Sequence, residues 1–136
     1  MKKRFRLSRG SVRLNQIFNY LRIDDQCSTS GQPSEGEFEL IKDAGFRTVI
    51  NLAPHDAENS LSDESGLLKS LSLNYVHIPV DFFKPNETDF SIFCNVMDNL
   101  REAKVWVHCA ANMRVSAFLF RYRTEKMGGP WMRALI

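Results

Sequence analysis

Hydrophobic and polar positions follow two different periods along this chain, and each change of period marks the border of an element. Short runs of extended character, rich in apolar or β-branched residues, end at turns and polar loops, as strands do. They cover residues 27–31, 48–52, 75–78 and 104–108. Between them, apolar residues recur every three or four positions, which is the spacing of one helix face. These segments predict helices at residues 34–44, 63–70, 88–103 and 114–127.

Local signals set the expected ends of these helices. Ser34 and Glu37 match a capping box, in which each side chain bonds to the backbone N–H of the other residue. Gly45 follows as a stop signal, and Thr88 is expected to cap the third helix. The segment 128–130 (GGP) breaks the last helix. The third helix carries its apolar face on Phe90, Phe93, Met97 and Leu100.

Strands that alternate with helices predict an α/β fold. We expect a three-layer sandwich, with a central, mostly parallel sheet of four to five strands flanked by helices and joined by right-handed crossovers. The length fits one domain, which we place at residues 14–136. Ligands on such sheets bind beyond the carboxyl ends of the strands. Because Cys109 directly follows the last predicted strand, the topology places it at the ligand-binding edge.

Composition narrows the class of protein. The 136 residues are 43% hydrophobic, enough for one core and too much for a disordered chain. No apolar run approaches the ~18 residues of a membrane span. Cys27, Cys94 and Cys109 are too widely spaced for a disulfide framework, so we expect reduced thiols in a cytoplasmic protein without a membrane partner. His55 and His77 show no metal-ligand spacing and no glycine-rich nucleotide loop is present, so we expect no metal and no cofactor.

The charge is unevenly distributed along the chain. Residues 1–13 hold six Lys or Arg and no acid, whereas the remaining residues hold 12 basic and 16 acidic side chains. The basic arm at 1–13 is either a solvated terminus or the contact site of an acidic partner. Since the body of the chain is mildly acidic, a nucleic-acid partner is not expected.

The segment Val105–Ser116 (VWVHCAANMRVS) carries the candidate chemistry. A cysteine acts as a nucleophile in its thiolate form. The thiolate of Cys109 would be favoured by the positive end of the following helix, by the Arg114 guanidinium and by the amides of the intervening loop. His108 would orient that loop, and Ser116 would donate to the sulfur. The same groups would bind a tetrahedral oxyanion. The predicted phosphate-binding residues are His108, Ala110, Ala111, Asn112, Met113 and Ser116.

Cleavage of a phosphate ester also requires an acid for the leaving oxygen. Asp81 is the best candidate because it follows the strand at residues 75–78, which should lie near the strand of Cys109. Phe82 and Phe83 would shield its carboxyl group and favour the protonated form. Glu87 and Asp89 fit better as acids of the first turn of a helix.

These motifs resemble the cysteine-dependent protein tyrosine and dual-specificity phosphatases, whose loop reads His-Cys-x5-Arg-Ser/Thr. They are more similar to a bacterial phosphatase-like family also found beside β-lactamase-like hydrolase domains, whose loop is His-Cys-x4-Arg. The resemblance covers most of the chain. It implies that Cys109 is the nucleophile, Arg114 the phosphate-binding residue and Asp81 the general acid. The matching segments are 29–33 (TSGQP), 45–52 (GFRTVINL), 75–81 (YVHIPVD) and 107–116 (VHCAANMRVS).

Two departures from the broader phosphatase pattern keep three functions open. The loop is one residue shorter, and Val115 replaces the usual Ser or Thr after the arginine. The first function is a phosphatase that hydrolyses a phosphotyrosine-like ester on a protein or small molecule through a phosphocysteine. The second is a rhodanese-like sulfurtransferase that carries a persulfide on Cys109, since such domains also use a four-residue loop. The third is a non-catalytic phosphate-binding module.

Overall fold

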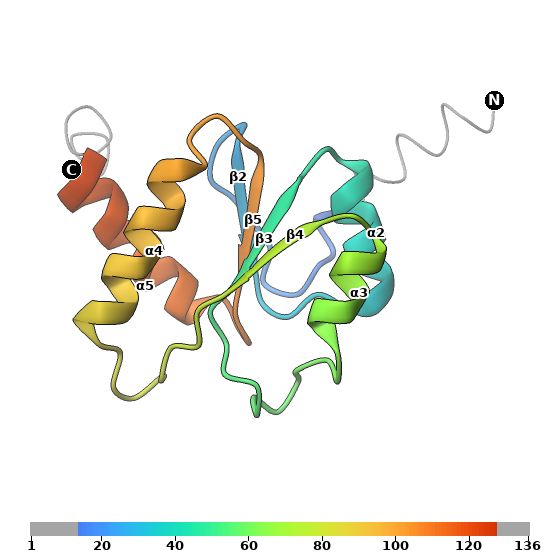
Figure 1. Cartoon of the computed structure of the whole chain (residues 1–136), viewed down its shortest axis with the longest axis horizontal. Coiled ribbons are helices and arrows are strands. Elements are labelled where there is room, and N and C mark those ends of the chain that lie inside the picture. The colour runs from blue at the N-terminus through green and yellow to red at the C-terminus, as the bar shows by residue number, and fades with distance from the viewer. Residues whose placement is uncertain (1–13, 128–136) are drawn as a thin grey trace.

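A five-stranded sheet forms the middle layer of the computed structural model, which describes residues 14–127 (Figure 1). The strand order is β1-β2-β5-β3-β4. β1 runs antiparallel to β2, and every other neighbouring pair is parallel, so the predicted mostly parallel sheet is confirmed. The strands are β1 (Leu21–Arg22), β2 (Cys27–Ser30), β3 (Thr48–Asn51), β4 (Asn74–His77) and β5 (Val105–His108).

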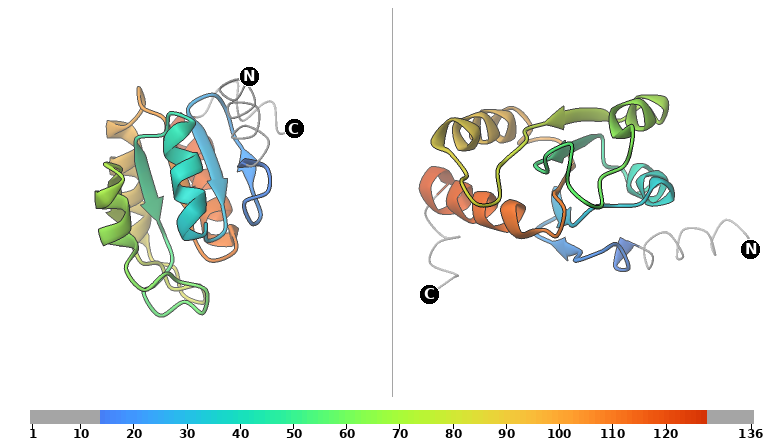
Figure 2. Two further views of the ribbon diagram at one scale, coloured as in Figure 1. Left: turned by 90° about the vertical axis from the view of Figure 1, so that its right-hand side faces the viewer. Right: turned by 90° about the horizontal axis from the view of Figure 1, so that it is seen from below.

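Helices cover both faces of the sheet, as Figures 1 and 2 show, which confirms the predicted three layers. One face carries α2 (Glu35–Asp43) and α3 (Glu64–Ser70), and the other carries α4 (Glu87–Asn99) and α5 (Met113–Arg121). A π-helical segment, η1 (Tyr122–Met127), continues α5. None of the described helices combines the length and the apolarity needed to cross a membrane.

The strands separate two hydrophobic cores because successive side chains of a strand point to opposite faces. Trp106 packs with the α2 and α3 side chains, whereas Val105 and Val107 pack with those of α4 and α5. Val49 and Ile50 divide in the same way on β3. Burial on both faces explains the apolar residues of β5 and of the middle of β3, whereas the inner strand β2 (CSTS) is buried with mostly polar side chains.

The helix ends follow the local signals in part. The capping box is confirmed: the Ser34 N–H donates to Glu37 Oε1 at 2.9 Å, and the Glu37 N–H donates to Ser34 Oγ at 3.3 Å. Gly45 ends that helix with a φ of 98°, a backbone angle that glycine adopts without steric cost. Thr88 as the cap of α4 is wrong, because Asn86 Oδ1 accepts from the Asp89 N–H at 2.8 Å.

Two helix boundaries differ from the sequence prediction, and one strand was not predicted. α4 ends at Asn99, whereas the apolar pattern predicted an end at residue 103. The pattern runs past the helix because Leu100, at the cap position, still packs on the core. α5 does not continue unchanged to residue 127: the Thr124 hydroxyl donates to the carbonyl oxygens of Phe120 and Arg121, which perturbs the backbone where η1 replaces it. The exposed two-residue β1 gave no periodic signal.

Two further predictions fall outside the described residues. They are the basic arm at residues 1–13 and the helix break at 128–130.

Candidate active site

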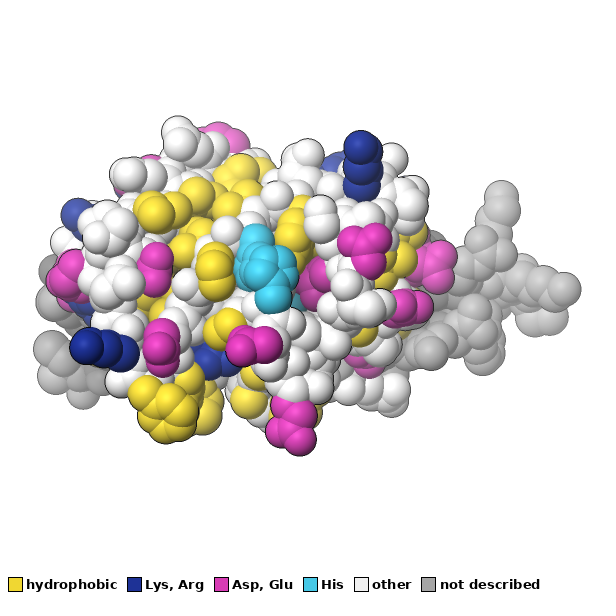
Figure 3. Space-filling view, turned by 60° about the horizontal axis from the view of Figure 1, so that its bottom comes forward, with side chains coloured by type: hydrophobic (Ala, Val, Ile, Leu, Met, Phe, Trp, Pro, Cys, Tyr) yellow, Lys and Arg dark blue, Asp and Glu magenta, His cyan; other side chains and the backbone are white. Residues whose placement is uncertain are grey.

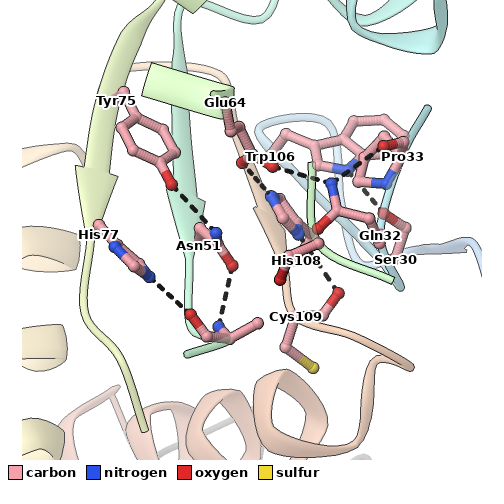
Figure 4. Close-up of polar contacts among 12 residues, drawn as sticks. Ser30, Gln32, Pro33, Asn51, Glu64, Tyr75, His77, Trp106, His108 and Cys109 are labelled. Carbon is pink, nitrogen blue, oxygen red and sulfur yellow. Dashed lines mark hydrogen bonds and ion pairs between the residues drawn. The ribbon is translucent and has the colours of Figure 1, made fainter. Parts of the chain in front are cut away.

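Cys109 lies just beyond the carboxyl end of β5, in the middle of the sheet. Ser30 at the end of β2 and Asn51 at the end of β3 both align with His108. Three strand ends therefore meet beside the cysteine, as Figure 4 shows. Cys109 is 1% exposed, and its backbone N–H donates to the carbonyl oxygen of Ser30 at 3.4 Å. The predicted position of Cys109 just beyond the carboxyl end of a parallel strand is confirmed.

The carbonyl groups of the loop between β5 and α5 are held by neighbouring segments. The Ala110 oxygen accepts from the Gln32 backbone N–H and from Asn59 Nδ2, each at 3.1 Å. The Ala111 oxygen accepts from Asn19 Nδ2 at 3.0 Å. Within the described part of the chain, the N–H groups of residues 110–114 donate to no protein acceptor. Successive free N–H groups beside a helix N-terminus form a binding place for an anion.

Asn112 closes this short loop. It adopts a left-handed conformation with φ 69° immediately before α5, a region that asparagine tolerates better than most residues. Its Nδ2 donates to the carbonyl oxygen of Asn19 at 2.8 Å and to Thr29 Oγ1 at 3.0 Å. The side chain therefore fixes the loop to β2 and to the segment before β1. The backbone N–H of Asn112 is one of the loop N–H groups without a protein acceptor among the described residues.

Arg114 lies in the first turn of α5 and is half-buried. Among residues 14–127 its guanidinium has no hydrogen-bond or ion-pair partner, and its Nε is buried. The guanidinium carbon lies 5.5 Å from the centroid of the Phe82 ring. A buried donor without a protein acceptor is unusual, and it leaves Arg114 available for an oxyanion.

His108 connects the cysteine to two residues, Glu64 and Gln32, to which the sequence gave no role in the site. Its ring is fully buried, with Nδ1 3.3 Å from the carbonyl oxygen of Cys109 and Nε2 2.6 Å from Glu64 Oε2. Gln32 Nε2 donates to the other Glu64 oxygen at 2.8 Å (Figure 4). Glu64 and Gln32 stand 44 and 76 positions before His108, and no spacing pattern links them to it. The only local signal at Glu64 was its place after the cap of a helix.

Asp81 follows the carboxyl end of β4, at the same edge of the sheet as Cys109, and its side chain caps a turn. Its Oδ1 accepts from the backbone N–H groups of Phe83 at 2.8 Å and Lys84 at 3.2 Å. The expected shielding is wrong: Asp81 is exposed, and Phe83 has 91% of its surface exposed. The expected nearness of the two strands is only partly right, since β3 separates β4 from β5. The contact between Phe82 and Arg114 nevertheless joins the Asp81 turn to the Cys109 loop.

The remaining predicted site residues lie at the border of the loop. Met113 is 61% exposed. Ser116 is exposed and lines a hollow between β1 and α5 that none of residues 108–114 shares. Its placement gives no support to a bond with the sulfur. Val115, in the usual Ser or Thr place, is fully buried in the core under α5.

The other two cysteines are buried side chains, as predicted. Burial raises the pKa of Cys27 to about 12, and the negative charge of Asp24 adds to the effect. Burial also raises the pKa of Cys94. A thiol with a raised pKa holds little thiolate at neutral pH and is a poor nucleophile. Cys109 is therefore the best-placed nucleophile among the three.

A histidine pair lies on the surface that Figure 3 shows. The rings of His55 and His77 are 4.4 Å apart, and His77 Nε2 donates to the carbonyl oxygen of Ala53 at 2.6 Å. They line a polar hollow together with Glu64 and Tyr75. Residues 14–127 contain no group of three or more His, Cys, Asp or Glu side chains placed to hold a metal ion.

Comparison with known proteins decides the family. The model of the family described as DSP-PTPase phosphatase fused to NAD+ kinase matches residues 23–130. The chain belongs to this DSP-PTPase family. A DUF442 protein of Shewanella putrefaciens CN-32, described as a candidate phosphatase, is 36% identical, with a TM-score of 0.82 over 88% of this chain and 79% of its own. The predicted membership of a bacterial phosphatase-like family is confirmed.

Two further proteins are similar to this chain, one in fold and one in sequence. P. aeruginosa TpbA, solved in complex with pTyr, shares the fold with 18% identity, a TM-score of 0.68 and coverage of 87% of this chain and 70% of its own. The β-lactamase hydrolase-like protein of Xylella fastidiosa is 30% identical over 101 residues. That match covers 68% of this chain, and the chain spans about a fifth of that relative's length (22%).

Proposed function

We propose that this domain is a cysteine-dependent phosphatase that hydrolyses phosphate monoesters through a phosphocysteine on Cys109. The observation that carries the proposal is the set of donors around the sulfur. The N–H groups of residues 110–114 and the Arg114 guanidinium have no acceptor among the described residues. Three equatorial phosphate oxygens would supply those acceptors, and charge developing on them would be stabilised by the same groups. Membership of the DSP-PTPase family supports this reading.

The reaction would proceed in two steps. The Cys109 thiolate attacks phosphorus while the ester P–O bond breaks, and the leaving oxygen takes a proton from Asp81. Water then attacks the phosphocysteine and gives its proton to Asp81. The S–P bond breaks, so that the thiolate is restored and inorganic phosphate leaves. The exposed position of Asp81 on a turn joined to Arg114 by Phe82 suits an acid that must reach the leaving group.

A phosphotyrosine-like ester is the substrate class we favour. Phe82 and Phe83 are exposed and meet edge to face with centroids 5.0 Å apart, next to the phosphate-binding arginine. Exposed aromatic rings at the mouth of a site would pack against the phenyl ring of such an ester. TpbA, which has the same fold, was solved with phosphotyrosine bound. A phosphorylated protein and a small aryl phosphate both meet this description.

Sulfur transfer is the competing function, because the four-residue loop offers less room than a five-residue one. The comparison uses aryl phosphate hydrolysis and the transfer of sulfur from thiosulfate to cyanide, both measured on the wild-type domain. In the second reaction Cys109 would take the outer sulfur of thiosulfate, release sulfite, and pass the sulfur to cyanide as thiocyanate. We expect phosphate release and no cyanide-dependent thiocyanate. Thiocyanate formation without phosphate release would replace the phosphatase proposal with a sulfurtransferase.

The general acid gives a prediction that depends on the leaving group. Asp81→Asn keeps an oxygen that accepts from the Phe83 and Lys84 amides. The amide has no carboxyl proton to give to the leaving oxygen. We expect kcat on an ordinary phenyl phosphate to fall about 100-fold, and kcat on the ester of a strongly acidic phenol to stay near wild type. Steady-state kinetics on the two esters measures this. Asp89→Asn is the matched control, and an equal loss on both esters would show that Asp81 is not the acid.

A further inference from the structure

Glu64 is the one carboxylate among residues 14–127 that is buried, with 6% of its surface exposed. An ionised carboxyl group inside a protein is costly unless it has partners. Both of its oxygens have one: Oε2 lies 2.6 Å from His108 Nε2, and Oε1 accepts from Gln32 Nε2 at 2.8 Å. This arrangement is built into the site, and the two-step reaction above does not use it.

The hydrogen bonds of His108 fix the place of one proton. The carbonyl oxygen of Cys109 has no hydrogen to donate, so the contact at 3.3 Å requires the proton on His108 Nδ1. A neutral imidazole with its proton on Nδ1 presents a lone pair at Nε2. The Glu64 carboxyl group faces that nitrogen, and one further proton lies between them. Whichever of the two groups holds it, His108 keeps Nδ1–H and the pair carries no net charge.

We propose that Glu64 is a positioning residue of the phosphatase site, an inference that rests on the function proposed above. It holds His108 with Nδ1–H directed at the Cys109 carbonyl group. On its other side the Cys109 backbone is held by the bond from its N–H to Ser30. The two bonds fix both peptide groups of the nucleophile and so aim the N–H groups of the loop at the oxyanion. In an active-site geometry of this kind, a displacement near 1 Å costs about 100-fold in rate.

Two substitutions separate hydrogen-bond geometry from charge. In Glu64→Gln the amide nitrogen can donate to His108 Nε2 while the amide oxygen accepts from Gln32, so the Nδ1–H tautomer is kept. Glu64→Met has a similar volume and no polar atom to offer. We expect the Gln variant to keep at least about a tenth of the wild-type kcat and the Met variant at most about a hundredth, with a smaller change in KM. Glu39→Gln and Glu39→Met, on the exposed side of α2, should stay within about twofold.

The proposal fails if the Met variant, folded as judged by circular dichroism, turns over at more than about a tenth of the wild-type rate. It also fails if the Gln variant is as impaired as the Met variant, because the charge of Glu64 would then matter and not its geometry.

A spectroscopic measurement keeps the inference testable if Glu64→Met does not fold or the domain has no phosphatase activity. The ¹⁵N shifts of the His108 ring report which nitrogen carries hydrogen. We expect Nδ1–H in the wild type and in Glu64→Gln, and inorganic phosphate should bind to both. An unprotonated Nδ1 in the wild type would overturn the role of Glu64. Absent turnover with Nδ1–H present would count against the phosphatase proposal and not against the positioning.

Discussion

Cys109→Ser should reduce kcat for aryl phosphate hydrolysis by at least about 10,000-fold, the scale of loss when an enzyme loses its nucleophile. A serine hydroxyl stays protonated at neutral pH, and within residues 14–127 no base is hydrogen-bonded to the side chain at position 109, since His108 contacts the backbone carbonyl group there and Glu64. Phosphate release from p-nitrophenyl phosphate measures the effect. Binding of inorganic phosphate should persist, because the loop amides and Arg114 are unchanged.

Cys94→Ser is the matched control for that substitution. Cys94 is 3% exposed and packs in the core under α4, so the hydroxyl group should lower the melting temperature and leave kcat unchanged. If Cys109→Ser retains more than about a hundredth of the wild-type rate, the nucleophile lies elsewhere and the phosphocysteine is excluded.

Arg114→Ala should lower kcat/KM about 1,000-fold, as expected for the loss of a group that stabilises charge on a transferring phosphoryl group. Its guanidinium is free of protein partners in residues 14–127 and stacks only on Phe82. Arg114→Lys keeps the charge but loses the planar pair of donors, so we expect a loss of about 100-fold. Steady-state kinetics and phosphate titration of both variants test the ranking.

Arg47→Ala provides the control for removal of a surface arginine, since Arg47 is exposed and bonds to Lys104 and Asn74 through its backbone. Its kinetics should match the wild type. Full activity in Arg114→Lys would mean that only a point charge is needed. Full activity in Arg114→Ala would mean that the substrate phosphate binds away from this loop.

Much of the fold could be read from local pattern because the signals are local. The capping box at Ser34 and the stop at Gly45 involve residues close in sequence, and the structure confirms both. The cap of α4 was misplaced because Asn86 and Thr88 are both good cap residues. Only the turn that leads into the helix, where Asn86 Oδ1 meets the Asp89 N–H, selects between them.

The position of the cysteine also followed from the sequence. The sequence did not show how a loop of only four residues between Cys109 and Arg114 closes. A strand that ends in His-Cys and a helix that begins four residues later place the thiol at a sheet edge by connectivity alone. How a loop of that length closes depends on Asn112, whose left-handed backbone is pinned by Asn19 and Thr29. These partners lie more than 80 positions away, and no periodicity connects them.

The sequence by itself determined the layered α/β fold and singled out Cys109 as the proposed nucleophile and Arg114 as the proposed oxyanion-binding residue, since each depends on spacing within one segment. The tertiary structure alone decided which groups surround them. It placed β3 between β4 and β5, left Asp81 exposed, brought Phe82 onto Arg114 and buried Glu64 against His108. The physical reason is that hydrophobic periodicity fixes which face of an element is buried. Which distant element covers that face, and in what register, is set only when the whole core packs together.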